Sequence, residues 1–121
     1  MKIAVLLALV SGCSARAHRV YRTSMQVLTA AAFVCDHDQT QTGLAMGIRE
    51  ANPFLGESPG PVVMWGSLAV SLATVVGIGL LPDKVPDYYK SMMITALAAV
   101  EGSIVAWNSG MIDRPFYRCG R

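Results

Sequence analysis

The side chains of this chain that could do chemistry are five polar residues set within apolar segments. They are Asp36, Gln39, Thr40, Glu101 and Asn108. On a helix, Asp36, Gln39 and Thr40 lie at positions i, i+3 and i+4 and therefore share one face. Glu101 and Asn108 lie at positions i and i+7 and share a face of a second helix. We expect these two faces to meet in one buried polar network.

Three roles fit such a network, and the residue pattern leaves all three open. Ionisable side chains at membrane depth normally face inward and pair, because a charge that faces lipid is costly. The network is then a hydrogen-bonded lock that fixes the register of the helices. Alternatively it binds a proton or cation, since Asp36 and Glu101 in one buried site would tend to share a proton. The third role is a polar face that docks a partner.

Patterns typical of catalysis or metal binding do not occur in the sequence. On a helix, His37 and Asp38 point away from the face that carries Asp36, so this acidic run is not a metal site by itself. We find no nucleophile–base pair, metal-ligand spacing or phosphate-binding loop. The sequence therefore predicts a protein that is not an enzyme and that uses no metal or other cofactor.

The composition of the chain favours a lipid environment. Of its 121 residues, 53% are hydrophobic and 15% are charged, and the mean hydropathy is +0.43. A domain of this size has too much surface to hide that apolar content from water. The net charge of +2 comes without a basic stripe interleaved with aromatic residues, so nucleic acid is not an expected partner.

Apolar runs separated by turn residues predict an all-α fold, a small membrane bundle of about three helices. The expected helices cover residues 24–48, 60–81 and 87–108. The second is the clearest, because Val62–Leu81 contains twenty residues and no charge, about the length that crosses a bilayer. Aromatic residues near the ends of the second and third segments are typical of membrane-interface anchors.

Three up-and-down spans would make the first and third helices parallel, which predicts their relative depth. Counting from comparable interfaces, Glu101 should lie near the depth of Gln39 and Thr40. Asn108 should then lie near Glu50 and Asn52, at the end of the first helix.

A turn is expected after the first helix, at Glu50, Asn52, Pro53 and Gly56. The residue before a proline is pushed out of the α region, an asparagine side chain can close the turn, and glycine permits a positive φ. This motif either only ends the helix or also closes the polar network at one membrane face.

The first residues are typical of a bacterial lipoprotein leader. Residues 1–12 hold one lysine and an apolar run that is too short to span a bilayer. The Val-Ser-Gly run before Cys13 is similar to a lipobox, which predicts cleavage of a signal peptide and lipidation of Cys13, for example with palmitate. The alternative is a hydrophobic N-terminus with a chance cysteine. Residues 13–121 would form a single helical membrane domain.

The cysteines do not indicate a disulfide framework. Cys13, Cys35 and Cys119 are odd in number and lack metal-ligand spacing. Cys35 is expected to be a small, buried, apolar side chain.

Two stretches of the sequence resemble a family of small membrane proteins from proteobacteria and their phages. Its pattern can be written D-x-x-Q-T followed by E-x-N-P-x-L-G-x-x-P, and it matches the run from Asp36 to Thr40 and the run from Glu50 to Pro59. Family members also often begin with a lipobox-like leader and carry an acid and an asparagine in the last helix. The resemblance implies membership and architecture, and no activity is established for the family.

These observations predict a non-enzymatic integral membrane lipoprotein of a bacterial envelope or phage, located in the inner membrane. Its expected partners are the lipid bilayer and other membrane proteins, or further copies of the chain. The alternative is an oligomeric protein that handles protons or ions with Asp36 and Glu101.

Overall fold

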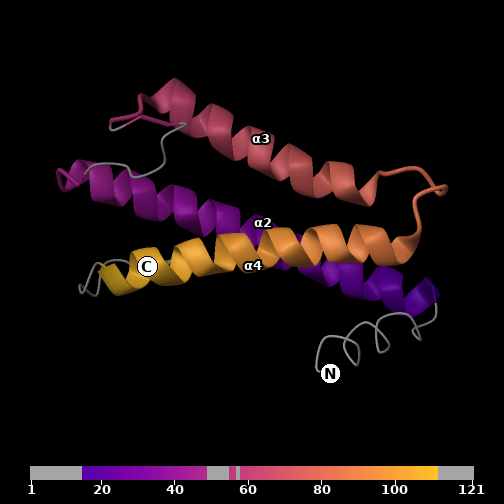
Figure 1. Cartoon of the computed structure of the whole chain (residues 1–121). Helices are drawn as coiled ribbons and strands as arrows, with labels where there is room; N and C mark the ends of the chain where they lie inside the picture. The colour runs from indigo at the N-terminus through magenta and orange to yellow at the C-terminus, as the bar shows by residue number, and fades with distance from the viewer. Residues whose placement is uncertain (1–14, 49–54, 57, 112–121) are drawn as a thin grey trace.

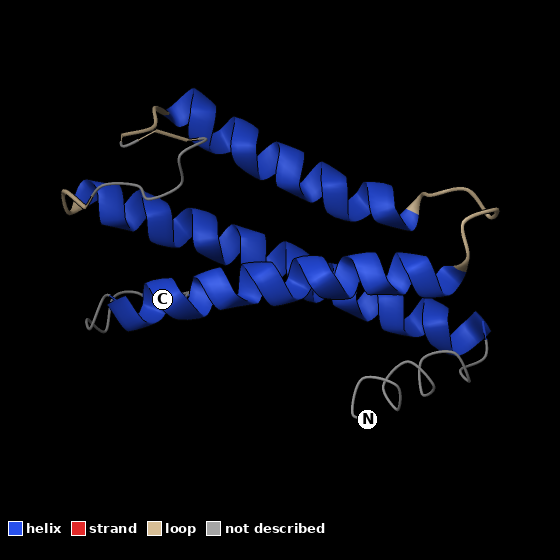
Figure 2. Cartoon of the chain, viewed as in Figure 1, coloured by secondary structure: helices blue, strands red, loops and turns tan. Residues whose placement is uncertain are grey.

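The computed structural model describes residues 15–48, 55–56 and 58–111, and every secondary-structure element in this part of the chain is a helix. The helices are α2 (Ala15–Ala45), α3 (Pro61–Gly79) and α4 (Asp87–Met111). Figure 2 shows these helices in blue and the described loops in tan. The prediction of an all-α bundle of three helices is confirmed.

The chain runs back and forth, so that α2 and α4 point in the same direction and α3 in the opposite one (Figure 1). α2 packs most extensively against α4 and also covers α3, whereas α3 and α4 touch each other little. α2 is therefore the helix that positions the other two.

α2 begins and ends earlier than predicted, at Ala15 and Ala45 rather than at residues 24 and 48. The predicted start placed the arginine-rich segment outside the helix, but arginine is a good helix former. Gly47 sets the end, since its φ of 80° is left-handed and favours glycine. The backbone N–H of Ile48 then donates to the carbonyl of Gly43 at 2.9 Å, which closes the last turn.

The ends of α3 and α4 follow from proline and acidic residues. Pro61 occupies the first turn of α3, where a missing N–H costs nothing. Asp87 lies in the first turn of α4, where a negative charge interacts favourably with the helix dipole. α4 continues to Met111, three residues past its predicted end at 108.

The buried apolar core is small. Val75 and Ile78 of α3 contact Ile94 of α4, which is completely buried, and three partly buried side chains pack around them. These are Met25, Phe33 and Leu97. Most other large apolar side chains therefore point outward.

Two of the described helices are long and apolar enough to cross a membrane, namely α3 and the Asp87–Ser109 portion of α4. Only 17% of each apolar window is buried. α2 has 31 residues and sufficient length, but it is not among the helices that pass by composition. Its polar residues lower its average hydropathy.

Candidate functional site

The predicted polar side chains gather where the C-terminal halves of α2 and α4 lie side by side. The Asn108 amide donates a hydrogen bond to the Asp36 carboxyl, with a distance of 2.8 Å between Nδ2 and Oδ1. One turn further along α2, the buried Gln39 amide donates to the Ser109 hydroxyl at 2.8 Å. We call this region, with His37 and Thr40, the polar end of the bundle.

The depth predicted for these residues is wrong. Asn108 meets Asp36, nine residues before the end of α2, whereas the prediction placed it level with the end of the first helix. Gln39 likewise meets Ser109, which lies eight residues, or about 12 Å along the helix, beyond Glu101. The predicted depths were counted from a first helix that started at residue 24. Because α2 begins at Ala15, its residues lie at a different register relative to α4 from the one expected.

Glu101 occupies a separate position inside the bundle. Its side chain is 5% exposed, and within the described residues its Oε1 atom has no hydrogen-bond partner. Asp36 is close enough for its charge to act on Glu101. The structure therefore brings Asp36, Gln39 and Asn108 into hydrogen-bonded pairs at the polar end, with buried Glu101 within reach of the Asp36 charge.

Thr40 belongs to the polar end but faces α3. It lines a cavity of about 30 Å³ with Asp36 and His37, and Ser67 and Ser71 of α3 add hydroxyl groups. The cavity has room for about one water molecule and not for a larger ligand. Its polar lining shows that the contact between α2 and α3 at the polar end is not purely apolar.

His37 packs against an aromatic side chain of α3. Its ring centroid lies 4.6 Å from that of Trp65, with the rings tilted by 49°. Trp65 and Trp107 are both exposed, and Trp107 immediately precedes Asn108. Exposed tryptophans are typical of membrane interfaces, and both of these tryptophans neighbour residues of the polar end.

The remaining predicted positions fall mostly outside the described residues. Gly56 is described and has a φ of 78°, the left-handed conformation that the turn requires. Glu50, Asn52 and Pro53, the leader at residues 1–12 and the lipidation site Cys13 lie outside the described ranges.

Cys35 differs from its predicted role. It is buried, as expected, but it is disulfide-bonded, and the cysteine that it bonds lies outside the described residues. An odd number of cysteines still allows one pair, and spacing along the chain does not tell which cysteines meet in space.

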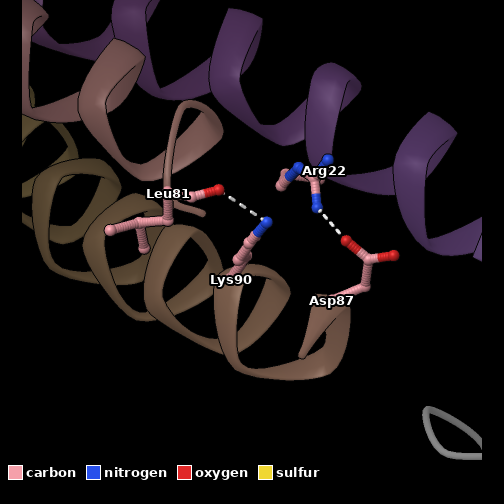
Figure 3. Close-up of polar contacts among 4 residues, drawn as sticks. All are labelled: Arg22, Leu81, Asp87 and Lys90. Carbon is pink, nitrogen blue, oxygen red and sulfur yellow. Dashed lines mark hydrogen bonds and ion pairs between the residues drawn. The ribbon is translucent and has the colours of Figure 1, made fainter. Parts of the chain in front are cut away.

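A second cluster, which the sequence interpretation missed, lies at the opposite end of the bundle (Figure 3). Arg22 of α2 forms an ion pair with Asp87 at the first residue of α4, with 2.6 Å between Nη1 and Oδ1. The buried Lys90 ammonium donates to the Leu81 carbonyl at 2.8 Å, which ties the start of α4 to the α3–α4 connector. Tyr21 and Thr95 share a further hydrogen bond of 2.7 Å.

We call this region the basic end. Its charged members in the described part of the chain are Arg16, Arg19, Arg22, Asp83, Lys84, Asp87 and Lys90. The arginines recur every three residues, a spacing that puts them near one helix face. This helical spacing of the arginines was the signal in the sequence that the first helix begins before Arg16.

Neither end has the donor set of a metal centre, since no group of three or more His, Cys, Asp or Glu side chains in the described ranges could hold a metal ion. The arrangement can do two things: fasten α2 to α4 at both ends, and keep one acid, Glu101, buried between them. Comparisons with protein-family models, curated proteins and solved structures find no match to this chain.

Proposed function

We propose that the chain is a small integral membrane protein of a bacterial or phage envelope that acts without catalysis, as an accessory to other membrane proteins. The observation that carries the proposal is the exposure of apolar side chains on α3, the most apolar helix. In α3 the exposed fraction of Val62 is 86% and that of Val70 is 68%. In water, such a continuous apolar surface is rare on a small monomer, whereas in lipid it carries no penalty.

In this proposal α2 crosses the bilayer beside α4, despite its lower average hydropathy. Its polar side chains Thr29 and Gln39 are buried against the other helices, whereas Asp38 and Gln41 are exposed. Its outward positions also include Val27 and Leu28, both of which are exposed. The average hydropathy of the helix therefore counts buried polar side chains that would not face lipid.

Small residues on the outward face of α3 support association with another membrane helix. Gly66 and Gly77 lie eleven residues apart on one face, and no heavy atom lies within 4 Å of the place where either would carry a Cβ. In lipid, glycines let the backbones of two helices approach closely. The lipobox-like leader and the family resemblance support an inner-membrane location and an anchor at Cys13.

The membrane proposal is tested by extracting membranes of an expressing bacterium at alkaline pH. We expect the chain to stay in the membrane pellet and to dissolve only in detergent. Release into the supernatant by alkaline carbonate would overturn the proposal.

The accessory role is tested by a photo-crosslinking residue at Val70 of α3, with Val27 of α2 as a matched exposed control. We expect discrete adducts with another protein from Val70 and weaker ones from Val27. Adducts of the chain with itself alone would replace the accessory role by self-association, and the absence of adducts at both positions would contradict it.

A second candidate function, the handling of protons or ions, is favoured by one observation: among the described residues, the Oε1 atom of buried Glu101 has no hydrogen-bond partner. A buried acid on a membrane helix is a typical element of such pathways. In liposomes, the purified chain should then carry a proton flux that Glu101→Gln abolishes and that Asp36→Asn reduces. A wild-type chain without flux would sink this candidate.

A further inference from the structure

We propose that the basic end of the bundle binds the headgroups of anionic phospholipids. This inference rests on the proposed membrane function and names the lipid class that the chain prefers. In the described part of this end, five Lys and Arg side chains face two Asp side chains, which leaves a net charge of +3. Figure 1 shows that the start of α2 and the α3–α4 connector, which supply these residues, lie at the same end of the bundle.

Two of the five positive charges are engaged inside the bundle, and three are left on its surface. Arg22 pairs with Asp87, and buried Lys90 donates to a backbone carbonyl (Figure 3). Arg16, Arg19 and Lys84 are exposed. The inner contacts therefore hold the helices together, while the outer side chains remain available to an anion.

The exposed charges lie at the edge of the lipid-facing surface. Leu80, at the end of α3, is exposed to the outside, and Lys84 follows it four residues later. Tyr88 and Tyr89 at the start of α4 are also exposed, with 4.1 Å between their ring centroids. Tyrosines of this kind lie at the depth of lipid headgroups, so the neighbouring cationic groups lie where lipid phosphates are.

A lipid is the partner that this arrangement fits best, because the anion-binding side chains continue directly into an apolar surface. One phospholipid can contact both, with its phosphate at the basic end and its acyl chains along α3. Each basic side chain near the membrane surface adds to the attraction for anionic lipid. At the polar end, the charged residues within the described ranges are the acids Asp36 and Asp38.

The test uses the purified full chain in detergent micelles with equimolar phosphatidylglycerol and phosphatidylcholine, and native mass spectrometry counts the bound lipids. The variant is Arg16→Gln/Arg19→Gln/Lys84→Gln, which keeps the contacts of Arg22 and Lys90. The matched control removes the same number of charges from the tail, as Arg114→Gln/Arg118→Gln/Arg121→Gln. Circular dichroism checks that both remain helical.

We expect the wild-type chain and the tail variant to retain phosphatidylglycerol preferentially. The basic-end variant should lose about tenfold in this preference, and high salt should weaken that of the wild type. Equal losses in both triple variants, or no loss in either, would overturn the proposal. A chain that alkaline carbonate releases from membranes would instead refute the proposed function, so the two failures are distinguishable.

Discussion

At the basic end of the bundle, α2 and α4 are joined by two opposite charges, Arg22 and Asp87, which lie near the surface. At the polar end the same two helices are joined by amide donors, from Asn108 to the Asp36 carboxyl and from Gln39 to the Ser109 hydroxyl. Both kinds of contact are partly buried. The attraction between two full charges is weakened by salt, whereas a hydrogen bond from a neutral amide is much less so.

The difference between the two ends shows how the register of a lipid-facing bundle can be fixed. Apolar side chains gain little from contacting each other instead of lipid, so an apolar seam alone allows helices to slide. Polar contacts at both ends of one helix pair remove that freedom. We expect the polar end to contribute the larger part of the stability.

The largest effect is expected from Asn108→Ala, which removes the amide that donates to Asp36. The free energy of unfolding should fall by about 1.5–3 kcal/mol, the range for hydrogen bonds to charged groups. Unfolding by sodium dodecyl sulfate in mixed micelles measures it. The control is Thr74→Ala, because the exposed Thr74 hydroxyl bonds only to the Val70 carbonyl of its own helix. Equal stability of the two variants would show that the Asp36–Asn108 contact does not hold the polar end.

The second effect concerns the acid between the two ends. Glu101→Leu should raise the free energy of unfolding by about 1–2 kcal/mol, because it removes a buried oxygen that has no partner in the described structure. Glu101→Gln serves as the isosteric control and should change stability less. A loss of stability in the leucine variant would instead show that Glu101 is part of the hydrogen-bonded network that fixes the helix register. The same unfolding titration in mixed micelles measures the stability of both variants.

A smaller effect is expected at the second pair of the polar end. Gln39→Ala and Ser109→Ala should each lower the free energy of unfolding by about 0.5–1.5 kcal/mol, since they break the same neutral hydrogen bond. The double variant should lose less than the sum of the two single losses, because the residues are coupled. Strictly additive losses would argue against the contact.

The smallest effect is expected from Arg22→Ala at the basic end, because 34% of the Asp87 side chain is exposed, so water can solvate its charge once Arg22 is removed. Its loss of stability should shrink further when the salt concentration rises, as screening already weakens the pair in the wild type. The loss caused by Asn108→Ala should stay constant over the same salt series. If both losses respond equally to salt, the proposed contrast between the ends is wrong.

Local signals in the sequence were enough to predict the three helices. Twenty uncharged residues determine α3, and Pro61 and Asp87 mark the starts of two helices at the predicted places. The pairing of α2 with α4 as parallel neighbours also followed, because short connectors force an up-and-down order. These features depend on residues close together along the chain.

The depth of the polar residues could not be predicted in the same way. It depends on Arg22 contacting Asp87, two residues 65 positions apart, and no local pattern encodes that pairing. The role of Ser109 was missed because a lone serine near a helix end has no distinctive spacing. The contact of His37 with Trp65 was missed as well, because it depends on the position of α3.

The unequal outer surfaces of α2 and α3 have a consequence for the surrounding lipid. From Val62 to Leu80, the outward surface of α3 is apolar over about 27 Å, close to the thickness of a bilayer core. From Val20 to Val34 the corresponding band of α2 is about 21 Å high. A bilayer that matches one side of the protein is too thick for the other, so the annulus of lipid must thin beside α2 or the whole bundle must lean toward it.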